Sequence, residues 1–82
     1  MVNKLYSIRD HKSGFYPPVV DTNDDTAKRN FSFAMNNNEN YAFAPADYDL
    51  YYVGSFDSET GLITCDHIPT LVASGVNVYA ES

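Results

Sequence analysis

The chain has 82 residues, enough for a single small domain, and its 44% hydrophobic and 15% aromatic content excludes wholesale disorder. The net charge is −6, from 11 acidic and 5 basic residues, so the chain as a whole repels a polyanion. All five bases lie within the first 29 positions, and the later positions carry seven acids and no base. Only the N-terminal third can therefore offer a basic face.

Cys65 is the only cysteine, which excludes an intrachain disulfide and a cysteine-based zinc site. The chain opens on a polar, tyrosine-containing stretch, where a signal peptide would need an apolar run. No stretch approaches the roughly 18 apolar residues that span a membrane. We therefore expect one soluble, intracellular domain over residues 1–82.

Two strands are expected before the first helix. Lys4–Asp10 alternates in the manner of a half-buried strand, and a polar turn follows it. Phe15–Val20 predicts a second strand that returns antiparallel to the first. Pro17 and Pro18 interrupt it, and because proline has no N–H for a sheet ladder, this strand should be an edge or be bent there.

A helix is predicted over residues 23–36. Thr22 or Asn23 can cap its start, and acidic residues follow where the helix dipole favours them. One apolar stripe, at i, i+4, i+7 and i+8, consists of Ala27, Phe31, Ala34 and Met35. Asn36–Asn38 ends the helix, since asparagine tolerates the conformation on which helices often end.

The longest strand-like stretch is Asp47–Phe56. Its more apolar face, on which we expect Phe31 and Met35 to rest, carries Tyr48, Leu50, Tyr52, Gly54 and Phe56. Asp57–Gly61 then reads as a five-residue hairpin loop. Leu62–Cys65 is the expected fourth strand.

The remaining segments carry weaker patterns. Glu39–Ala44 reads as a short linker with two aromatic residues. His67–Pro69 should bend the chain, and Thr70–Gly75 fits either a helical turn or a short strand. Val76–Tyr79 fits a last edge strand or a docking tail.

These elements predict an α+β fold, a small antiparallel sheet of three to five strands with one helix, about 23–36, packed on one face. The expected order is β-β-α-β-β plus a tail element. Parallel pairing of the first and third strands across the helix is the alternative. Exposed sheet edges and seven tyrosines favour a homodimer.

No constellation typical of catalysis or metal binding is present. Cys65 and His67 could share a strand face as a thiol–base pair, but nothing nearby would form an oxyanion site. Asp47 and Asp49 share one strand face, and like the loop acids they are best interpreted as solvated. We predict no enzyme activity, no cofactor and no metal.

Aromatic residues interleave with bases in the N-terminal third, a pattern that can stack nucleobases and neutralise phosphates. The candidate nucleic-acid contacts are Lys4, Arg9, Lys12, Lys28 and Arg29 for phosphates, and Tyr6 and Tyr16 for stacking. The alternative interpretation is that the bases solvate the surface and the aromatics are core or interface. The sequence pI near 4.4 argues for this alternative.

Three segments give the chain a family resemblance. Lys4–Asp10 is similar to a Lys-Leu-Tyr-Ser-Ile-Tyr-Asp opening, and Asp24–Phe31 to an acid-x-x-Ala-x-Arg-x-Phe helix. Asp47–Gly61 is the most specific, with its Asp-Tyr-x-Leu-Tyr-x-x-Gly-x-Phe-Asp-x-x-Thr-Gly spacing. The chain resembles the small non-structural protein of gokushovirus-type microviruses, which are bacteriophages with single-stranded DNA genomes. Residues beyond Cys65 match only as a loose, proline-containing tail.

The resemblance implies a non-catalytic phage accessory protein of the host cytoplasm, acting in viral single-stranded DNA replication or packaging. It would bind single-stranded DNA or the phage's replication and packaging proteins. The alternative is an acidic protein-interaction module, a host-factor binder or DNA mimic, that does not touch nucleic acid. The family supplies no active-site residues.

Overall fold

The computed structural model describes residues 2–76, leaving aside the side chains of residues 40, 42, 66 and 67. Its elements, in chain order, are β1 (Val2–Asp10), β2 (Gly14–Phe15), β3 (Val19–Asp21), α1 (Asp24–Asn37), α2 (Glu39–Phe43), the 3-10 helix η1 (Pro45–Asp47), β4 (Tyr48–Asp57) and β5 (Ile63–Ser74). The predicted linker over 39–44 is mostly the short helix α2. The predicted last element over 76–79 lies, from residue 77 on, outside the described residues.

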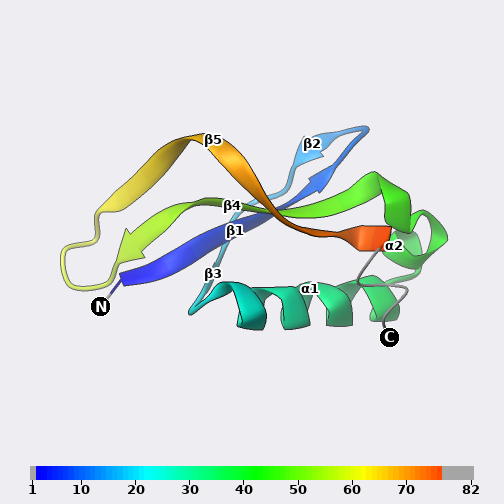
Figure 1. Ribbon diagram of the computed structural model, residues 1–82, viewed down its shortest axis with the longest axis horizontal. Helices are drawn as coiled ribbons and strands as arrows, with labels where there is room; N and C mark the ends of the chain where they lie inside the picture. Colours follow the sequence, from blue (N-terminus) through cyan, green and yellow to red (C-terminus); the bar gives the residue numbers. More distant parts are fainter. Residues whose placement is uncertain (1, 77–82) are drawn as a thin grey trace.

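The strands form one sheet in the order β2-β1-β4-β5, with β3 also paired to β1 (Figure 1). Every pairing is antiparallel. The central pair joins β1 to β4, with Leu5 opposite Gly54 and Ile8 opposite Leu50. The alternative of parallel pairing across the helix is therefore wrong, because the chain returns along β1 in the opposite direction after α1 and α2.

The predicted second strand is divided into two pieces. β2 pairs with Arg9 and Asp10, and β3 pairs with β1 between Lys4 and Tyr6. Pro17 and Pro18 lie between the two pieces, outside the ladder, so their missing N–H groups cost no hydrogen bond of the sheet. The expectation of an interrupted edge is confirmed.

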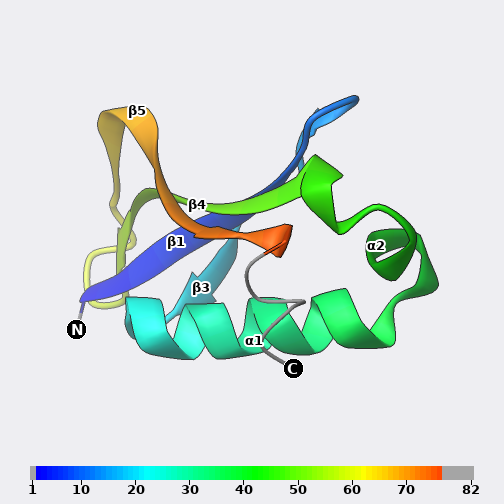
Figure 2. The ribbon, with the colours of Figure 1, turned by 45° about the vertical axis from the view of Figure 1, so that its right-hand side comes forward.

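The fourth strand is much longer than predicted. β5 continues past Cys65 through Pro69 to Ser74, so Thr70–Ser74 is strand, the second of the two predicted options. The pairing runs from Gly54↔Cys65 directly to Tyr52↔Thr70, which leaves extra residues on β5. They arch away from β4 in Figures 1 and 2. Proline is tolerated here because β5 is the last strand of the sheet order and its residues near Pro69 leave the ladder.

The predicted arrangement, a small sheet of three to five strands with one helix on one face, is therefore wrong, although the fold is α+β. The strands account for more of the chain than predicted, and the sheet curls into a half-barrel (Figure 2). Register shifts explain the curl: β4 has an extra residue opposite Leu5/Tyr6, and β5 has extra residues opposite Leu50/Tyr51 and Tyr52/Gly54. Such bulges bend a strand and increase its twist. Sequence periodicity does not reveal where they fall.

Helix α1 begins as the sequence predicts. The Asn23 side chain accepts a hydrogen bond from the backbone N–H of Thr26 at 2.8 Å, and Asp24 and Asp25 occupy the first turn. Of the two predicted caps, Asn23 is the one used.

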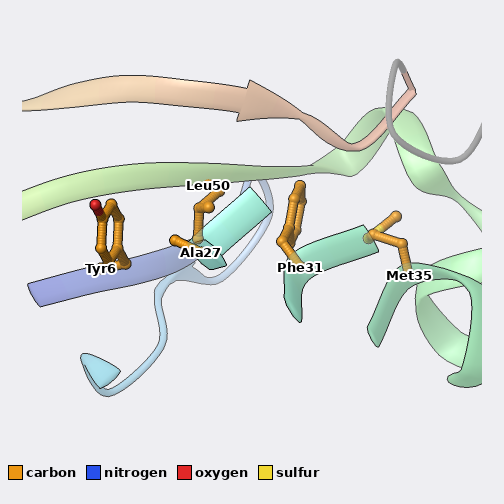
Figure 3. Packing of buried hydrophobic residues seen from close by; sticks show 5 residues of the cluster. All are labelled: Tyr6, Ala27, Phe31, Met35 and Leu50. Carbon is orange, nitrogen blue, oxygen red and sulfur yellow. The ribbon is translucent and has the colours of Figure 1, made fainter. Parts of the chain in front are cut away.

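The core lies between α1 and the middle of the sheet (Figure 3). Its buried members are Tyr6, Ala27, Phe31, Met35 and Leu50, with Tyr48 and Tyr52 among the half-buried residues against them. The predicted helix stripe and the predicted face of β4 therefore meet. Phe33, off the stripe, is 70% exposed. Gly54 is buried, and its close neighbour is the backbone of Thr64 in β5.

Candidate functional site

The seven predicted nucleic-acid contacts do not form one surface. Lys4 lies beside the start of α1, with its Nζ 3.6 Å from Asp24 Oδ1 and 5.7 Å from the centre of the Tyr52 ring. The positive charge of Lys4 is thus paired with the carboxylate of Asp24 in the same chain.

Tyr6 is a core residue. Its side chain is 0% exposed, and its hydroxyl donates a 2.5 Å hydrogen bond to Asp24 Oδ1. Burial, together with this carboxylate, raises the pKa of the Tyr6 hydroxyl. The prediction that Tyr6 stacks on a nucleobase does not fit this position, because alternation along β1 directs Tyr6 and Ile8 toward α1.

Arg9, by the same alternation, belongs to the opposite side of the sheet. Its guanidinium lies 5.8 Å from the centre of the Phe15 ring, and Phe15 meets Tyr51 edge-on with 5.4 Å between ring centres. Lys28 and Arg29 are exposed on α1, away from the buried stripe. Lys4, Lys28 and Arg29 thus lie at α1, and Arg9 lies on the opposite side of the sheet.

Lys12 and Tyr16, two of the predicted residues, come together at a concave surface. Both line a cleft of about 460 Å³ at the end of the sheet near α2 and η1. We call it the tyrosine cleft, and its lining residues are Asp10, Lys12, Tyr16, Asn38, Tyr41, Phe43, Ala44, Asp47 and Tyr48. They come from β1, the segments on either side of β2, α2, η1 and β4, so the cleft exists only in the folded chain.

Three tyrosine rings form one side of the cleft. Tyr16 stacks on Tyr41, with 6.3 Å between ring centres and 27° between planes, and Tyr41 meets Tyr48 at 4.6 Å and 53°. All three are half-buried, and Phe43 beside them is 91% exposed. The Phe43 ring adds little to the stability of the fold at this exposure, and its surface is accessible to a partner.

Two carboxylates and one ammonium supply the charge of the cleft. Asp47 Oδ2 lies 3.7 Å from Lys12 Nζ, and Lys12 is 83% exposed. Asp10 accepts hydrogen bonds from the backbone N–H of Lys12 at 2.9 Å and from the Ser13 hydroxyl at 3.0 Å. These donors, the backbone one foremost, lower the pKa of the Asp10 carboxyl, so it stays charged. The cleft therefore has a net negative charge.

Tyr16 and Tyr41 stay neutral over the physiological pH range, because the pKa of each hydroxyl is raised. Burial, with the neighbouring tyrosines, raises the pKa of Tyr16 to about 12. Burial also raises the pKa of Tyr41, with Tyr48 and Asp10 adding to the effect. Neutral rings beside ionised carboxylates form an electron-rich lining.

Sequence reasoning missed Tyr41, Phe43 and Tyr48 as site residues and considered Asp47 only as a solvated acid. The usable signal was the pair of aromatics in the 39–44 segment followed by Pro45, since a short polar linker has no need of two aromatic rings. What joins them to Tyr16 is the fold: the backbone N–H of His11 donates to Asp47 O at 2.8 Å and brings the β1–β2 turn to η1.

A second hollow of about 200 Å³ lies between β3 and α1. It is lined mainly by apolar side chains, among them Val19, Val20 and Ala34, with Asp21 and Asn30 joined across it by a 2.8 Å hydrogen bond. It lacks the charged groups of the tyrosine cleft beyond that one acid.

Among the side chains that the structure describes, no group of three or more His, Cys, Asp or Glu residues is placed to hold a metal ion. Cys65 is exposed, and the His67 side chain is not described, so a Cys65–His67 pair stays a hypothesis. Among the described helices, none combines the length and the apolar content needed to cross a membrane.

The comparisons with known proteins give one match. Searches of curated proteins and of solved structures found none. A family model described as "Phage ORF5 protein" matches residues 3–78, nearly the whole chain. It does not test the finer resemblance to gokushovirus-type microviruses, which stays a prediction. The prediction of a phage protein is confirmed, and the chain belongs to the Phage ORF5 protein family.

Proposed function

We propose that this phage accessory protein acts by binding rather than by catalysis, in the host cytoplasm, during viral single-stranded DNA replication or packaging. Its partner is a protein of the replication or packaging machinery, and contact is made through the tyrosine cleft.

The observation that carries this proposal is the net negative charge of the tyrosine cleft, where aromatic side chains and charged groups converge. Asp10 and Asp47 outnumber Lys12 there, the chain has a net charge of −6, and the other bases lie on separate surfaces. A single-stranded DNA site needs a basic groove that follows the backbone, with aromatic residues interleaved. Half-exposed tyrosines, an exposed Phe43 and spare negative charge fit a protein partner better.

Direct contact with single-stranded DNA is the second candidate. It is favoured by one observation, that Lys12 and Tyr16 share the cleft. A base could stack on Tyr16 while Asp47 accepts from its amino group, as acidic side chains do from cytosine.

Capture from infected cells separates the two candidates. The chain, tagged and purified, is incubated with lysate in the presence and absence of nuclease. Under our proposal a phage-encoded protein is retained after nuclease treatment and is lost when Phe43→Ser and Tyr41→Ser are introduced together. If retention requires intact nucleic acid, the protein-partner proposal is wrong.

A titration with oligodeoxycytidylate, whose bases carry the amino group, at low and raised salt tests the second candidate directly. DNA binding through the cleft requires affinity that falls as salt rises, and Lys12→Gln should reduce it. Lys28→Ala combined with Arg29→Ala is the matched control, because these bases lie outside the cleft. Equal loss in both variants would place DNA contact elsewhere than in the cleft.

A further inference from the structure

We propose that the tyrosine cleft is a recognition site for a single cationic side chain, an arginine, carried by a basic segment of a partner protein. The inference names the chemistry of the partner and rests on the proposed function. It comes from the combination of open aromatic faces with two carboxylates in one concave site.

The aromatic part of the cleft suits a guanidinium. A cation over the face of a tyrosine ring is attracted by the ring's negative quadrupole, more strongly when the site excludes water. Tyr16 stacks on Tyr41, the Tyr41 ring also meets Tyr48, and all three rings remain partly exposed to solvent. Arginine fits better than lysine because its planar group can lie flat on a ring and still donate along its edge.

The carboxylates provide acceptors for that edge. Asp47 has a side chain 32% exposed, so its charge is neither fully solvated nor already enclosed. Asp10 is held in place by its hydrogen bonds to the 12–13 backbone and side chain, which keep it ionised. A guanidinium reaching Asp47 would therefore gain a charge-assisted hydrogen bond while Asp10 contributes a fixed negative field.

Lys12 shows where such a cation would lie. Its ammonium is 3.7 Å from Asp47, but the side chain is 83% exposed, so this ion pair contributes little to stability. The chain's own lysine is thus a weak internal competitor that an incoming arginine displaces into solvent. A nucleic-acid site would need Lys12 in the opposite role, as a contact to phosphate.

The test uses two blocked tripeptides, acetyl-Gly-Arg-Gly-amide and the same peptide with citrulline, the neutral isostere of arginine. Each is titrated into the full chain and followed by NMR shifts of the cleft backbone. The arginine peptide should bind about tenfold more tightly than the citrulline peptide. This ratio corresponds to about 1.4 kcal/mol in binding free energy. Equal binding of the two peptides would overturn the inference.

Three variants sharpen the result. Asp47→Asn should weaken arginine binding severalfold, and Lys12→Gln should strengthen it by removing the competitor. Lys28→Gln, outside the cleft, should change nothing. Weaker binding in Lys12→Gln would overturn the inference, and so would displacement of the arginine peptide by oligodeoxycytidylate that depends on Lys12. Unchanged NMR spectra outside the cleft show that each variant is folded.

Failure of this inference can be told apart from failure of the proposed function. If a phage protein is captured after nuclease treatment and Asp47→Asn captures it equally well, the proposed function holds and the arginine site is wrong. If the arginine peptide binds as described but no phage protein is captured, the site stands and the partner assignment is wrong.

Discussion

The core and the tyrosine cleft use the same residue type in opposite ways. Tyr6, under the middle of the sheet, is fully buried and hydrogen-bonded to Asp24. Tyr16, Tyr41 and Tyr48, at the end of the sheet, pack on one another and remain partly exposed to solvent. The difference follows from what covers each region: the 14-residue α1 covers the middle, whereas the five-residue α2 and η1 only border the end (Figure 2).

This contrast indicates how stability and binding are divided in the chain. Apolar surface stabilises a fold only when it is removed from water. The core residues therefore contribute the greater part of the stability. The cleft residues have unburied aromatic surface left, and that surface can stabilise a complex instead.

The largest expected effect is that of Phe31→Ala. Phe31 is 2% exposed between α1 and the sheet, so its truncation should lower the free energy of unfolding by about 3–5 kcal/mol. Phe33→Ala, two residues on and 70% exposed, is the matched control and should cost less than about 1 kcal/mol. Urea unfolding of both variants measures the difference. Similar losses would contradict the placement of the core.

The next effect compares two tyrosine hydroxyls. Tyr6→Phe removes the hydrogen bond to Asp24 and should cost about 1–2 kcal/mol in unfolding free energy. Tyr41→Phe keeps the ring contacts of the cleft and should be nearly neutral, because the described contacts of Tyr41 are made by its ring. A cost for Tyr41→Phe as large as that for Tyr6→Phe would show that the cleft is as tightly bonded as the core.

Alkaline pH should destabilise the folded chain. The folded-state pKa of Tyr16 is about 12, above the ordinary value of 10.0, so the folded state keeps a proton that the unfolded state loses. This stabilisation is fully present below pH 10 and is lost as pH rises toward 12. Urea midpoints at pH 8, 10 and 11 should fall progressively. In Tyr16→Phe the fall should be smaller, and what remains comes from Tyr6 and Tyr41, whose pKa values are also raised. If the urea midpoint of Tyr16→Phe falls as much as that of the unsubstituted chain, Tyr16 has the same pKa in the folded and unfolded states.

The local elements follow from the sequence because local rules decide them. The Asn23 cap and the Ala27–Phe31–Met35 stripe depend on spacing within one helix. The prolines of the second strand, which lack an N–H, predict its interruption just as directly. The predicted apolar face of β4 holds for Tyr48, Leu50 and Tyr52, because alternation is a property of one strand. It does not extend to Phe56, because the register shifts between Tyr52 and Gly54.

The sheet's extent and the cleft could not be predicted in the same way. Pro69 reads locally as the end of a strand, yet it is accommodated because β5 is at the edge of the sheet and bulges there. Tyr6 and Tyr16 look equivalent in sequence, since each is an aromatic residue near a base. Only the position of α1 over one and not the other assigns the first to the core and the second to a cleft.

The smallest expected effect concerns the contact that joins the turn after β1 to the end of β4. His11 Nε2 lies 2.6 Å from Asp49 Oδ2, and the His11 side chain is 43% exposed. His11→Ala should lower the free energy of unfolding by less than about 1 kcal/mol, because water can reach the partly exposed His11 side of this hydrogen bond and the backbone bond from His11 to Asp47 remains. Urea unfolding measures the loss, and the arginine-peptide affinity should stay within about twofold since neither partner lines the cleft. A loss comparable with that of Phe31→Ala would mean that this end of the sheet is stabilised as strongly as its centre, and the division between a stabilising core and a binding cleft would fail.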